Sequence, residues 1–198
     1  MDDIVKQAMA KWPNVPFCYG WLALDARGAW RMRDETAQRA GAPGDRLTNA
    51  ALIGFIDRNY LADEQGRWYF QNGPQRVYVN LEATPFIART DPARGLAVHT
   101  GEALGDIDAA CMLDDGALVL RAGDRVAQLD DRDLAQVLPA IELDGKPVTD
   151  EALLAWLADG GEGLVLRWQG RAVAIERSTA AALPERFGFV RRPDGAPA

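Results

Sequence analysis

Two segments of the sequence, LTNAALIGFIDR at residues 47–58 and VTDEALLAWLAD at residues 148–159, align without gaps at an offset of 101. In both, apolar residues recur at positions i, i+3 and i+4, a spacing that puts them on one face of an α-helix. They are Leu52, Phe55 and Ile56 in the first segment and Leu153, Trp156 and Leu157 in the second. Thr48 and Thr149 are expected to be the N-caps, because a threonine hydroxyl can accept a hydrogen bond from a free N–H of the first turn. The sequence therefore predicts two equivalent helices.

Each predicted helix stands between two predicted β-hairpins. Every hairpin consists of two apolar runs joined by a turn that contains glycine, the residue that most easily adopts positive φ. The four segments are residues 21–32 and 67–82 around the first helix, and residues 111–120 and 163–176 around the second. The shared order of hairpin, helix and hairpin indicates an internal duplication. It predicts an α+β fold of two tandem related units with antiparallel sheets, an N-terminal unit over 1–92 and a C-terminal unit over 93–198.

The segments between these elements are less regular. Residues 33–45 are an insert in the first copy whose Gly/Ala/Pro tail is typical of a mobile loop. The second copy carries an insert at 129–147, which predicts a short helix ending before Pro139. The composition of residues 88–96 indicates a linker or wide turn, and the tail beyond Phe189 is expected to be disordered. A further helix at the N-terminus is predicted from the spacing of Ile4, Ala8, Met9 and Trp12.

Composition and charge exclude several classes of function. The 198 residues include 22 basic and 29 acidic side chains, a formal net charge of −7. This argues against a nucleic-acid partner, since phosphate binding favours a basic face. The two cysteines, Cys18 and Cys111, cannot supply a disulfide framework or a cysteine-only metal site, and the single histidine, His99, excludes two-histidine metal motifs. The sequence therefore predicts no metal and no cofactor, and both cysteines are expected to be buried, unreactive thiols.

The compartment is inferred from the same data. The N-terminus MDDIVKQAMAKW is acidic and lacks the basic start and apolar core of a secretory signal. No stretch approaches the roughly 18 consecutive apolar residues of a membrane span. We therefore expect a cytoplasmic protein without a membrane partner.

The hairpin at 67–82 supplies the first candidate binding residues. Because alternate residues of a strand share a face, Val77, Val79 and Leu81 should point to the core. The opposite face would present an aromatic surface, a fixed cation and an amide, a set that could hold a planar anionic ligand by stacking and a bidentate contact. Its members are Tyr69, Arg76, Tyr78 and Asn80. The alternative, which the sequence favours, is that these side chains simply cover a half-exposed sheet.

Three further residues are weaker candidates. Arg171 follows the turn of the last hairpin as Arg76 follows that of the earlier one, and it is interpreted as a ligand contact or, more simply, as an edge charge that prevents unwanted strand pairing. Trp21 lies in an aromatic-rich run and could line a pocket or cover a hydrophobic groove. His99 could act as a general base if an acidic residue oriented it, although a lone histidine more often has a packing or surface role.

Four successive stretches of the sequence resemble bacterial, chiefly proteobacterial, uncharacterised proteins classed as a domain of unknown function. They are GWLALDARGAWRM (20–32), LIGFIDRNYLADEQGRWYF (52–70), GPQRVYVNLEATPF (73–86) and VHTGEAL (98–104). This resemblance implies a duplicated core and a C-terminal half like a pleckstrin-homology fold. It also implies a ligand site between the halves, for a nucleotide-like molecule, and a part in signalling. It brings no catalytic residues.

Three hypotheses about function follow. The leading one is a non-catalytic ligand-binding or regulatory protein that holds an anionic small molecule between its two halves. The second is a small-molecule hydrolase or transferase that uses His99. The third is a protein-interaction module that docks a partner through the aromatic face or through residues 33–45. An uncovered sheet edge leaves a homodimer open as well.

Overall fold

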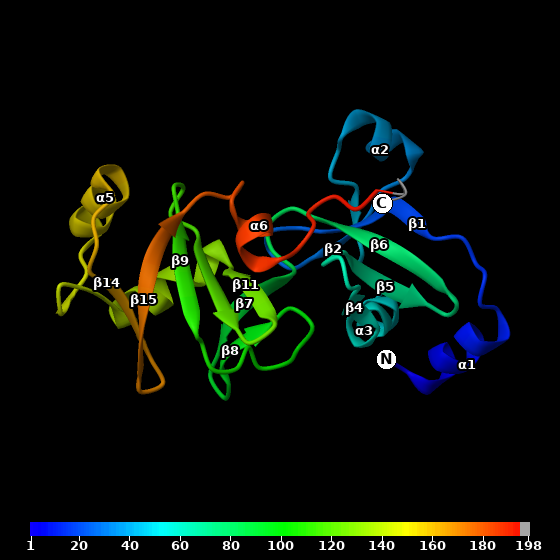
Figure 1. Ribbon diagram of the computed structural model, residues 1–198, viewed down its shortest axis with the longest axis horizontal. Helices are drawn as coiled ribbons and strands as arrows, with labels where there is room; N and C mark the ends of the chain where they lie inside the picture. Colours follow the sequence, from blue (N-terminus) through cyan, green and yellow to red (C-terminus); the bar gives the residue numbers. More distant parts are fainter. Residues whose placement is uncertain (195–198) are drawn as a thin grey trace. The chain divides into compact units, whose positions relative to one another are not determined.

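The computed structural model describes residues 1–194 and divides into two compact units, each with its own β-sheet (Figure 1). Unit 1 comprises Met1–Pro85, His99–Gly101 and the segment from Pro184, and unit 2 comprises Phe86–Val98 and Glu102–Leu183. The sheets are mostly antiparallel and helices occur in both units, so the predicted α+β class is confirmed. No helix in the described part of the chain has the length and apolar character needed to cross a membrane.

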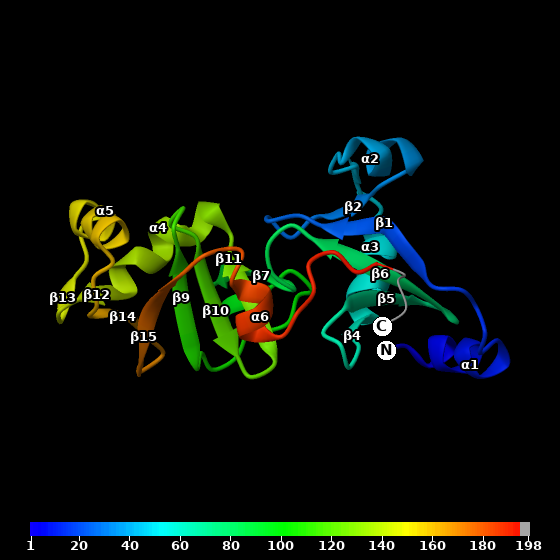
Figure 2. The ribbon, with the colours of Figure 1, turned by 45° about the horizontal axis from the view of Figure 1, so that its top comes forward.

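Unit 1 is built on a six-stranded sheet. Its strands are β1 (Cys18–Leu24), β2 (Trp30–Met32), β3 (Asp45–Arg46), β4 (Tyr60–Ala62), β5 (Trp68–Asn72) and β6 (Gln75–Leu81). Its helices are α1 (Asp3–Lys11), α2 (Glu35–Ala40) and α3 (Ala50–Arg58), and most of the short helix α6 (Leu183–Phe187) belongs to this unit too. Helix α3 packs on the apolar face of the sheet, where the ring of Phe55 meets that of Phe70 edge to face at 5.4 Å (Figure 2).

Unit 2 is built on a nine-stranded sheet. Its strands are β7 (Phe86–Asp91), β8 (Gly95–Val98), β9 (Ala109–Leu113), β10 (Leu118–Ala122), β11 (Arg125–Leu129), β12 (Ile141–Leu143), β13 (Lys146–Pro147), β14 (Leu164–Trp168) and β15 (Arg171–Ser178). Its helices are α4 (Leu134–Val137), flanked by the 3₁₀ turns Asp131–Asp133 and Leu138–Ala140, and α5 (Asp150–Asp159). Helix α4 ends before Pro139, as the sequence predicts. The core is apolar, with Met112, Leu118 and Leu166 fully buried.

The same arrangement of six strands occurs in both sheets. The order in unit 1 is β3-β2-β1-β6-β5-β4, and the corresponding order within unit 2 is β11-β10-β9-β15-β14-β12. In each unit the first strand of the first hairpin pairs in parallel with the last strand of the second, β1 with β6 and β9 with β15. The predicted order of hairpin, helix and hairpin is therefore confirmed in each unit. The parallel pairs, including β7 with β11, were not expected in sheets predicted as antiparallel.

The two equivalent helices begin one residue apart in the alignment. The hydroxyl of Thr149 accepts a hydrogen bond from the N–H of Ala152 at 3.2 Å and caps α5, as predicted. The cap of α3 is Asn49, whose side chain accepts from the N–H of Leu52 at 3.0 Å, so the prediction of Thr48 is wrong. Both residue types can cap, and the one whose backbone is extended immediately before the first helical residue performs the role.

The segment expected to be a linker is a β-hairpin. Residues 88–96 fall in β7 and β8, which pair with each other, and β7 also pairs with β11. Ala88 is completely buried within this ladder, while the charged residues of the turn are exposed. Because β7 belongs to the sheet of unit 2, the contacts divide the chain at Pro85/Phe86, whereas the sequence placed the boundary at 92/93.

The insert at 33–45, expected to be a mobile loop, contains the helix α2. The carboxylate of Asp34 caps the helix by accepting from the N–H of Ala37 at 2.7 Å. Gly41 ends it in the left-handed conformation, with φ of 64°. A capped start and a glycine stop account for an ordered turn of helix in a segment that has no apolar stripe.

Both ends of the chain differ from expectation. Helix α1 forms, but its buried residue is Val5, whereas Ile4, assigned to the apolar stripe, is 71% exposed. The segment after Phe189, expected to be disordered, is bonded to unit 1 at two residues: the N–H of Val190 donates to the carbonyl of Gly66 at 3.0 Å, and the carbonyl of Arg191 accepts from the N–H of Leu81 at 2.8 Å. Residues 195–198 lie outside the described part of the chain.

Candidate functional site

Strand register places the first four candidate residues on one face of the unit 1 sheet. Tyr69 lies opposite Tyr78 on β5 and β6, and Asn80 lies beside Ala23 of β1. Residues that are paired directly share a face, and alternate residues of one strand do too. We call this face, which carries Tyr69, Arg76, Tyr78 and Asn80, the polar face. The expected alternation is therefore present, but the exposure of the four residues differs widely.

Tyr78 is a buried member of a hydrogen-bonded cluster. Its side chain has no exposed surface, and its ring stacks on that of Tyr19 at 4.7 Å between centroids. Its hydroxyl donates to Asp63 at 3.0 Å and accepts from the guanidinium of Arg67 at 3.3 Å. Partial burial alone would raise the pKa of Asp63, but hydrogen bonds from Arg67 and Tyr78 outweigh it and the pKa is lowered. The ring faces of Tyr78 are thus occupied within the protein.

Arg76 is held between two aromatic rings. Its guanidinium carbon lies 4.6 Å from the ring centre of Tyr69 and 5.4 Å from that of Phe17, distances typical of cation–π contacts. It borders a cavity of about 410 Å³ that also receives Asp63, Glu64 and Arg67. Two arginines and two carboxylates balance there, so this cavity has no excess charge with which to select an ion.

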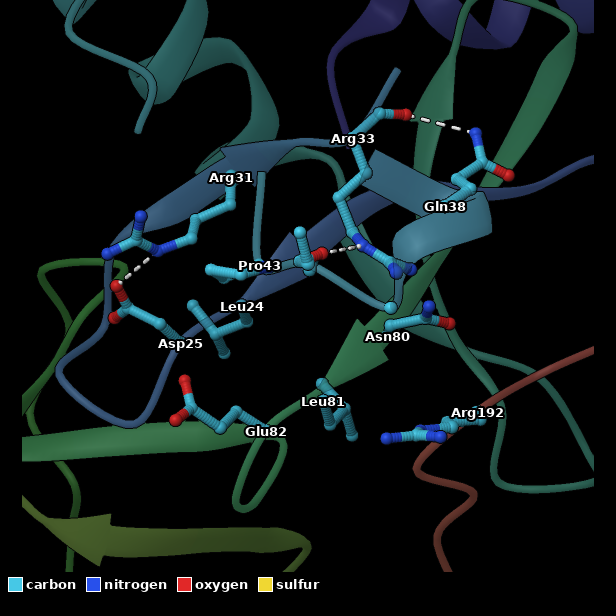
Figure 3. Close-up of a pocket in the computed structure, with 13 residues that line it drawn as sticks. Leu24, Asp25, Arg31, Arg33, Gln38, Pro43, Asn80, Leu81, Glu82 and Arg192 are labelled. Atoms are coloured by element: carbon cyan, nitrogen blue, oxygen red, sulfur yellow. Dashed lines mark hydrogen bonds and ion pairs between the residues drawn. The ribbon is translucent and has the colours of Figure 1, made fainter. Parts of the chain in front are cut away.

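A second cavity of unit 1 lies at the other end of the polar face, where Asn80 is found. It measures about 580 Å³, and we call it the arginine cavity (Figure 3). Its polar lining consists of Asp25, Arg31, Arg33, Gln38, Asn80, Glu82 and Arg192, and its apolar or backbone lining of Ala23, Leu24, Gly41, Ala42, Pro43 and Leu81.

Three parts of the chain meet at the arginine cavity. The parallel pair of β1 and β6 forms its floor, with Ala23 beside Asn80 and Leu24 beside Leu81. The segment after β2 and the turn that follows α2 form one wall. The C-terminal segment, bonded to β6 through the carbonyl of Arg191, brings Arg192 to the cavity. The cavity thus joins residues that are more than a hundred positions apart in the sequence.

Arg33 is fixed by backbone oxygens. Its Nε donates to the carbonyl of Ala42 at 3.0 Å and its Nη1 to that of Gly20 at 3.4 Å. The amide of Gln38 in turn donates to the carbonyl of Arg33 at 3.0 Å. Within residues 1–194, no carboxylate lies at ion-pair distance from Arg33 or from the exposed Arg192. Two guanidinium groups therefore border one cavity with their charges uncompensated by a carboxylate.

The carboxylates of the cavity are already engaged with the β1–β2 turn. Asp25 is buried and accepts from the N–H of Ala29 at 2.8 Å and from Nε of Arg31 at 2.8 Å. Oε2 of Glu82 accepts from the N–H of Ala26 at 3.0 Å, which holds this side chain at the mouth of the turn. Arg31 is consequently neutralised by Asp25, whereas one oxygen of Glu82 is left for another partner.

The remaining candidates lie elsewhere. The imidazole of His99 packs against the rings of Trp30 at 5.3 Å and Tyr60 at 5.9 Å, and it borders none of the cavities described here. Burial lowers the pKa of His99 to about 3, with Asp25 opposing the shift. A general base is most effective with a pKa near the working pH, so this environment disfavours the enzyme hypothesis based on His99.

Trp21 and Arg171 do not line the arginine cavity either. Trp21 is 39% exposed on β1 and is not part of the cavity lining. Arg171 lies in unit 2, where its guanidinium pairs with Asp106 at 2.6 Å beside a cavity of about 530 Å³. Of the two cysteines, Cys111 is buried and Cys18 is half-buried with a pKa raised by burial, which keeps its thiol protonated.

Fold and cavity define an α+β protein whose first unit carries an arginine-lined cavity. The chain belongs to the family described as protein of unknown function (DUF2946), whose model matches residues 1–194. The family match confirms the predicted resemblance to proteins classed as a domain of unknown function. No curated protein matches the chain.

Two solved structures are similar to the chain. A DUF1285 family protein from Silicibacter pomeroyi DSS-3 is 16% identical with a TM-score of 0.49, and the match covers 92% of this chain and 98% of that one. A DUF1285 family protein from Shewanella baltica OS155 is 14% identical with a TM-score of 0.40, covering 59% of this chain and 88% of that one. Neither description states an activity.

Proposed function

We propose that this protein is a non-catalytic ligand-binding protein whose first unit takes a small anionic molecule in the arginine cavity. The observation that carries the proposal is that Arg33 and Arg192 border one cavity without a carboxylate partner among residues 1–194. The chain as a whole has a net charge of −7, so an excess of arginine in one cavity runs against its average composition.

The chemistry of the lining suits an anion. A guanidinium presents planar pairs of N–H donors that match carboxylate or phosphate oxygens, and such charge-assisted hydrogen bonds are stronger than neutral ones. Arg33 is preorganised because two backbone carbonyls hold its side chain. The amide of Asn80 adds a neutral donor, and this residue is the one sequence-predicted candidate that lines the cavity.

The test is calorimetric titration of inorganic phosphate into the wild type and into Arg192→Gln. A charge-assisted hydrogen bond contributes about 1.5–3 kcal/mol, so we expect affinity to fall by roughly 10- to 100-fold. Arg58→Gln, on the exposed surface of α3, is the matched control, because it removes the same charge outside the cavity. Equal loss in both variants, or no binding to the wild type, would count against the proposal.

Several sequence predictions on origin, ligand and cellular role go beyond the fold and the family. We infer that the two units arose by duplication, which their common six-strand order supports. A pleckstrin-homology-like second half, a nucleotide-like ligand between the halves, a regulatory role in signalling, a homodimer and a cytoplasmic location stay predictions. The protein-interaction hypothesis also stays a prediction, although Trp12 and Phe17 are half-exposed, at 51% and 49%.

A further inference from the structure

The arginine cavity has two chemically different ends. Arg33, Asn80 and Arg192 gather on one side of the view in Figure 3, and Asp25, Arg31 and Glu82 on the other. The register separates Asn80, which lies beside Ala23, from Glu82, whose N–H bonds to the carbonyl of Leu24. Arg31 also pairs with Ala23, but its guanidinium reaches Asp25 at the second end. Two residues of a strand span about 6.5 Å, so the two ends are separated by the length of a small molecule.

The first end recognises negative charge. Arg33 and Arg192 supply guanidinium N–H donors and Asn80 supplies an amide, and Arg33 and Arg192 have no carboxylate partner within residues 1–194. A phosphate has enough oxygens to accept from all three side chains at once.

The second end presents both a hydrogen-bond acceptor and a hydrogen-bond donor. Oε2 of Glu82 is held by the N–H of Ala26, which leaves Oε1 as an acceptor fixed in position. Arg31 donates through Nε to Asp25 and through Nη1 to the carbonyl of Gly44, which leaves Nη2 as a donor. An acceptor and a donor in one cavity match a hydroxyl group, which donates and accepts at the same time.

We propose that the ligand of the arginine cavity is a phosphate monoester of a polyhydroxyl compound, such as a sugar phosphate. The inference rests on the proposed function and adds the class of ligand to it. The phosphate lies on Arg33, Asn80 and Arg192, and the hydroxyl end reaches Glu82. The volume of about 580 Å³ is that of a site for a small organic molecule, far larger than a bare phosphate needs.

A ligand with an ammonium group at the second end is the main competitor. The charge of Arg31 is already paired with Asp25, but its free Nη2 needs a hydrogen-bond acceptor, which a hydroxyl provides and an ammonium cannot. The neighbouring lining from Ala23, which shares the face of Asn80, and from Pro43 offers apolar contact to the carbon skeleton that joins the two ends.

The experiment compares inorganic phosphate, ribose 5-phosphate and 3-aminopropyl phosphate by calorimetry on the full-length wild type, Glu82→Gln and Arg192→Gln. The Glu82→Gln variant is isosteric, and its amide oxygen can still accept from Ala26, so the turn is preserved; a thermal melt checks the fold. We expect ribose 5-phosphate to bind the wild type at least tenfold more tightly than phosphate. Glu82→Gln should abolish that advantage, so that ribose 5-phosphate and phosphate bind this variant about equally, whereas Arg192→Gln should weaken both.

The outcomes separate the two levels of the proposal. If phosphate binds but ribose 5-phosphate binds no better, or if Glu82→Gln keeps the tenfold preference, the hydroxyl site is refuted and the anion site stands. If 3-aminopropyl phosphate binds most tightly, the second end selects an ammonium and the ligand class is wrong. If none of the three binds the wild type, the proposed function itself fails.

Discussion

Replacing Tyr78 with phenylalanine tests whether the centre of the polar face is structural. The hydroxyl donates to Asp63 at 3.0 Å and accepts from Arg67 at 3.3 Å, in a side chain with no exposed surface. Hydrogen bonds to charged groups contribute about 1.5–3 kcal/mol. Asp63 keeps its ion pair with Arg67 and two backbone N–H donors in the variant, so we expect a loss near the lower limit, about 1.5 kcal/mol.

The assay is urea denaturation followed by tryptophan fluorescence, with a thermal melt in parallel. For a chain of this size, about 1.5 kcal/mol corresponds to a decrease in Tm of roughly 3–6 °C. Tyr69→Phe is the matched control: this ring is also buried, and no hydrogen bond to its hydroxyl occurs within residues 1–194, so its cost should stay below about 0.5 kcal/mol. Equal stability of Tyr78→Phe and Tyr69→Phe would refute the assignment of Tyr78 to the cluster.

Three further predictions concern stability. Asn49→Ala should cost about 1 kcal/mol in urea denaturation and Thr48→Ala close to nothing, because only the former loses the cap of α3; the reverse order would restore the sequence prediction. Gly66→Ala should destabilise the protein far more than Gly41→Ala in thermal melts. Both glycines have positive φ, but a Cβ at Gly66 would lie 2.1 Å from the carbonyl oxygen of Gly188, while a Cβ at Gly41 would meet nothing within 4 Å. The pKa of His99 is about 3 in the folded protein against about 6.5 in the unfolded chain, so the unfolded chain binds an extra proton between these values. The free energy of unfolding should therefore fall by up to about 1.4 kcal/mol per pH unit below pH 6.5. His99→Gln should show a shallower fall between pH 6.5 and 3, and the same dependence on pH as in the wild type would contradict a neutral imidazole in the folded protein.

The local elements of the fold could be predicted because their signals are local. The apolar spacing of Leu52, Phe55 and Ile56 is enough to predict a helix, and glycine turns between apolar runs are enough to predict the hairpins. The exact cap could not be predicted, since Thr48 and Asn49 are both good capping residues and only the backbone conformation decides between them.

Pairing between distant strands could not be predicted in the same way. Nothing local in residues 88–96 shows that this charged segment forms a hairpin that pairs with β11. Its composition does not reveal that Arg89 pairs with the buried Asp133 or that Ala88 is buried. The parallel pairing of β1 with β6 could not be predicted either, because neither segment has a sequence feature that identifies the other as its partner.

The candidate site was predicted only in part for the same reason. Alternation along β6 correctly placed Arg76, Tyr78 and Asn80 on one face, but it could not show that Tyr19 covers Tyr78. Arg192 belongs to a tail whose composition is typical of disorder, and its place in the arginine cavity depends on the backbone bond between Leu81 and Arg191. The sequence does show that all of the 22 basic side chains except Lys6, Lys11 and Lys146 are arginine, a composition that suits anion binding but marks no particular position.

The most direct test of the central claim is arginine modification by phenylglyoxal, mapped by mass spectrometry with and without phosphate. If an anion binds in the arginine cavity, phosphate should slow the modification of Arg192 several-fold and leave that of Arg58 unchanged, since Arg58 is exposed on α3 outside the cavity. Equal rates at Arg192 with and without phosphate, at concentrations up to the millimolar range, would contradict the claim.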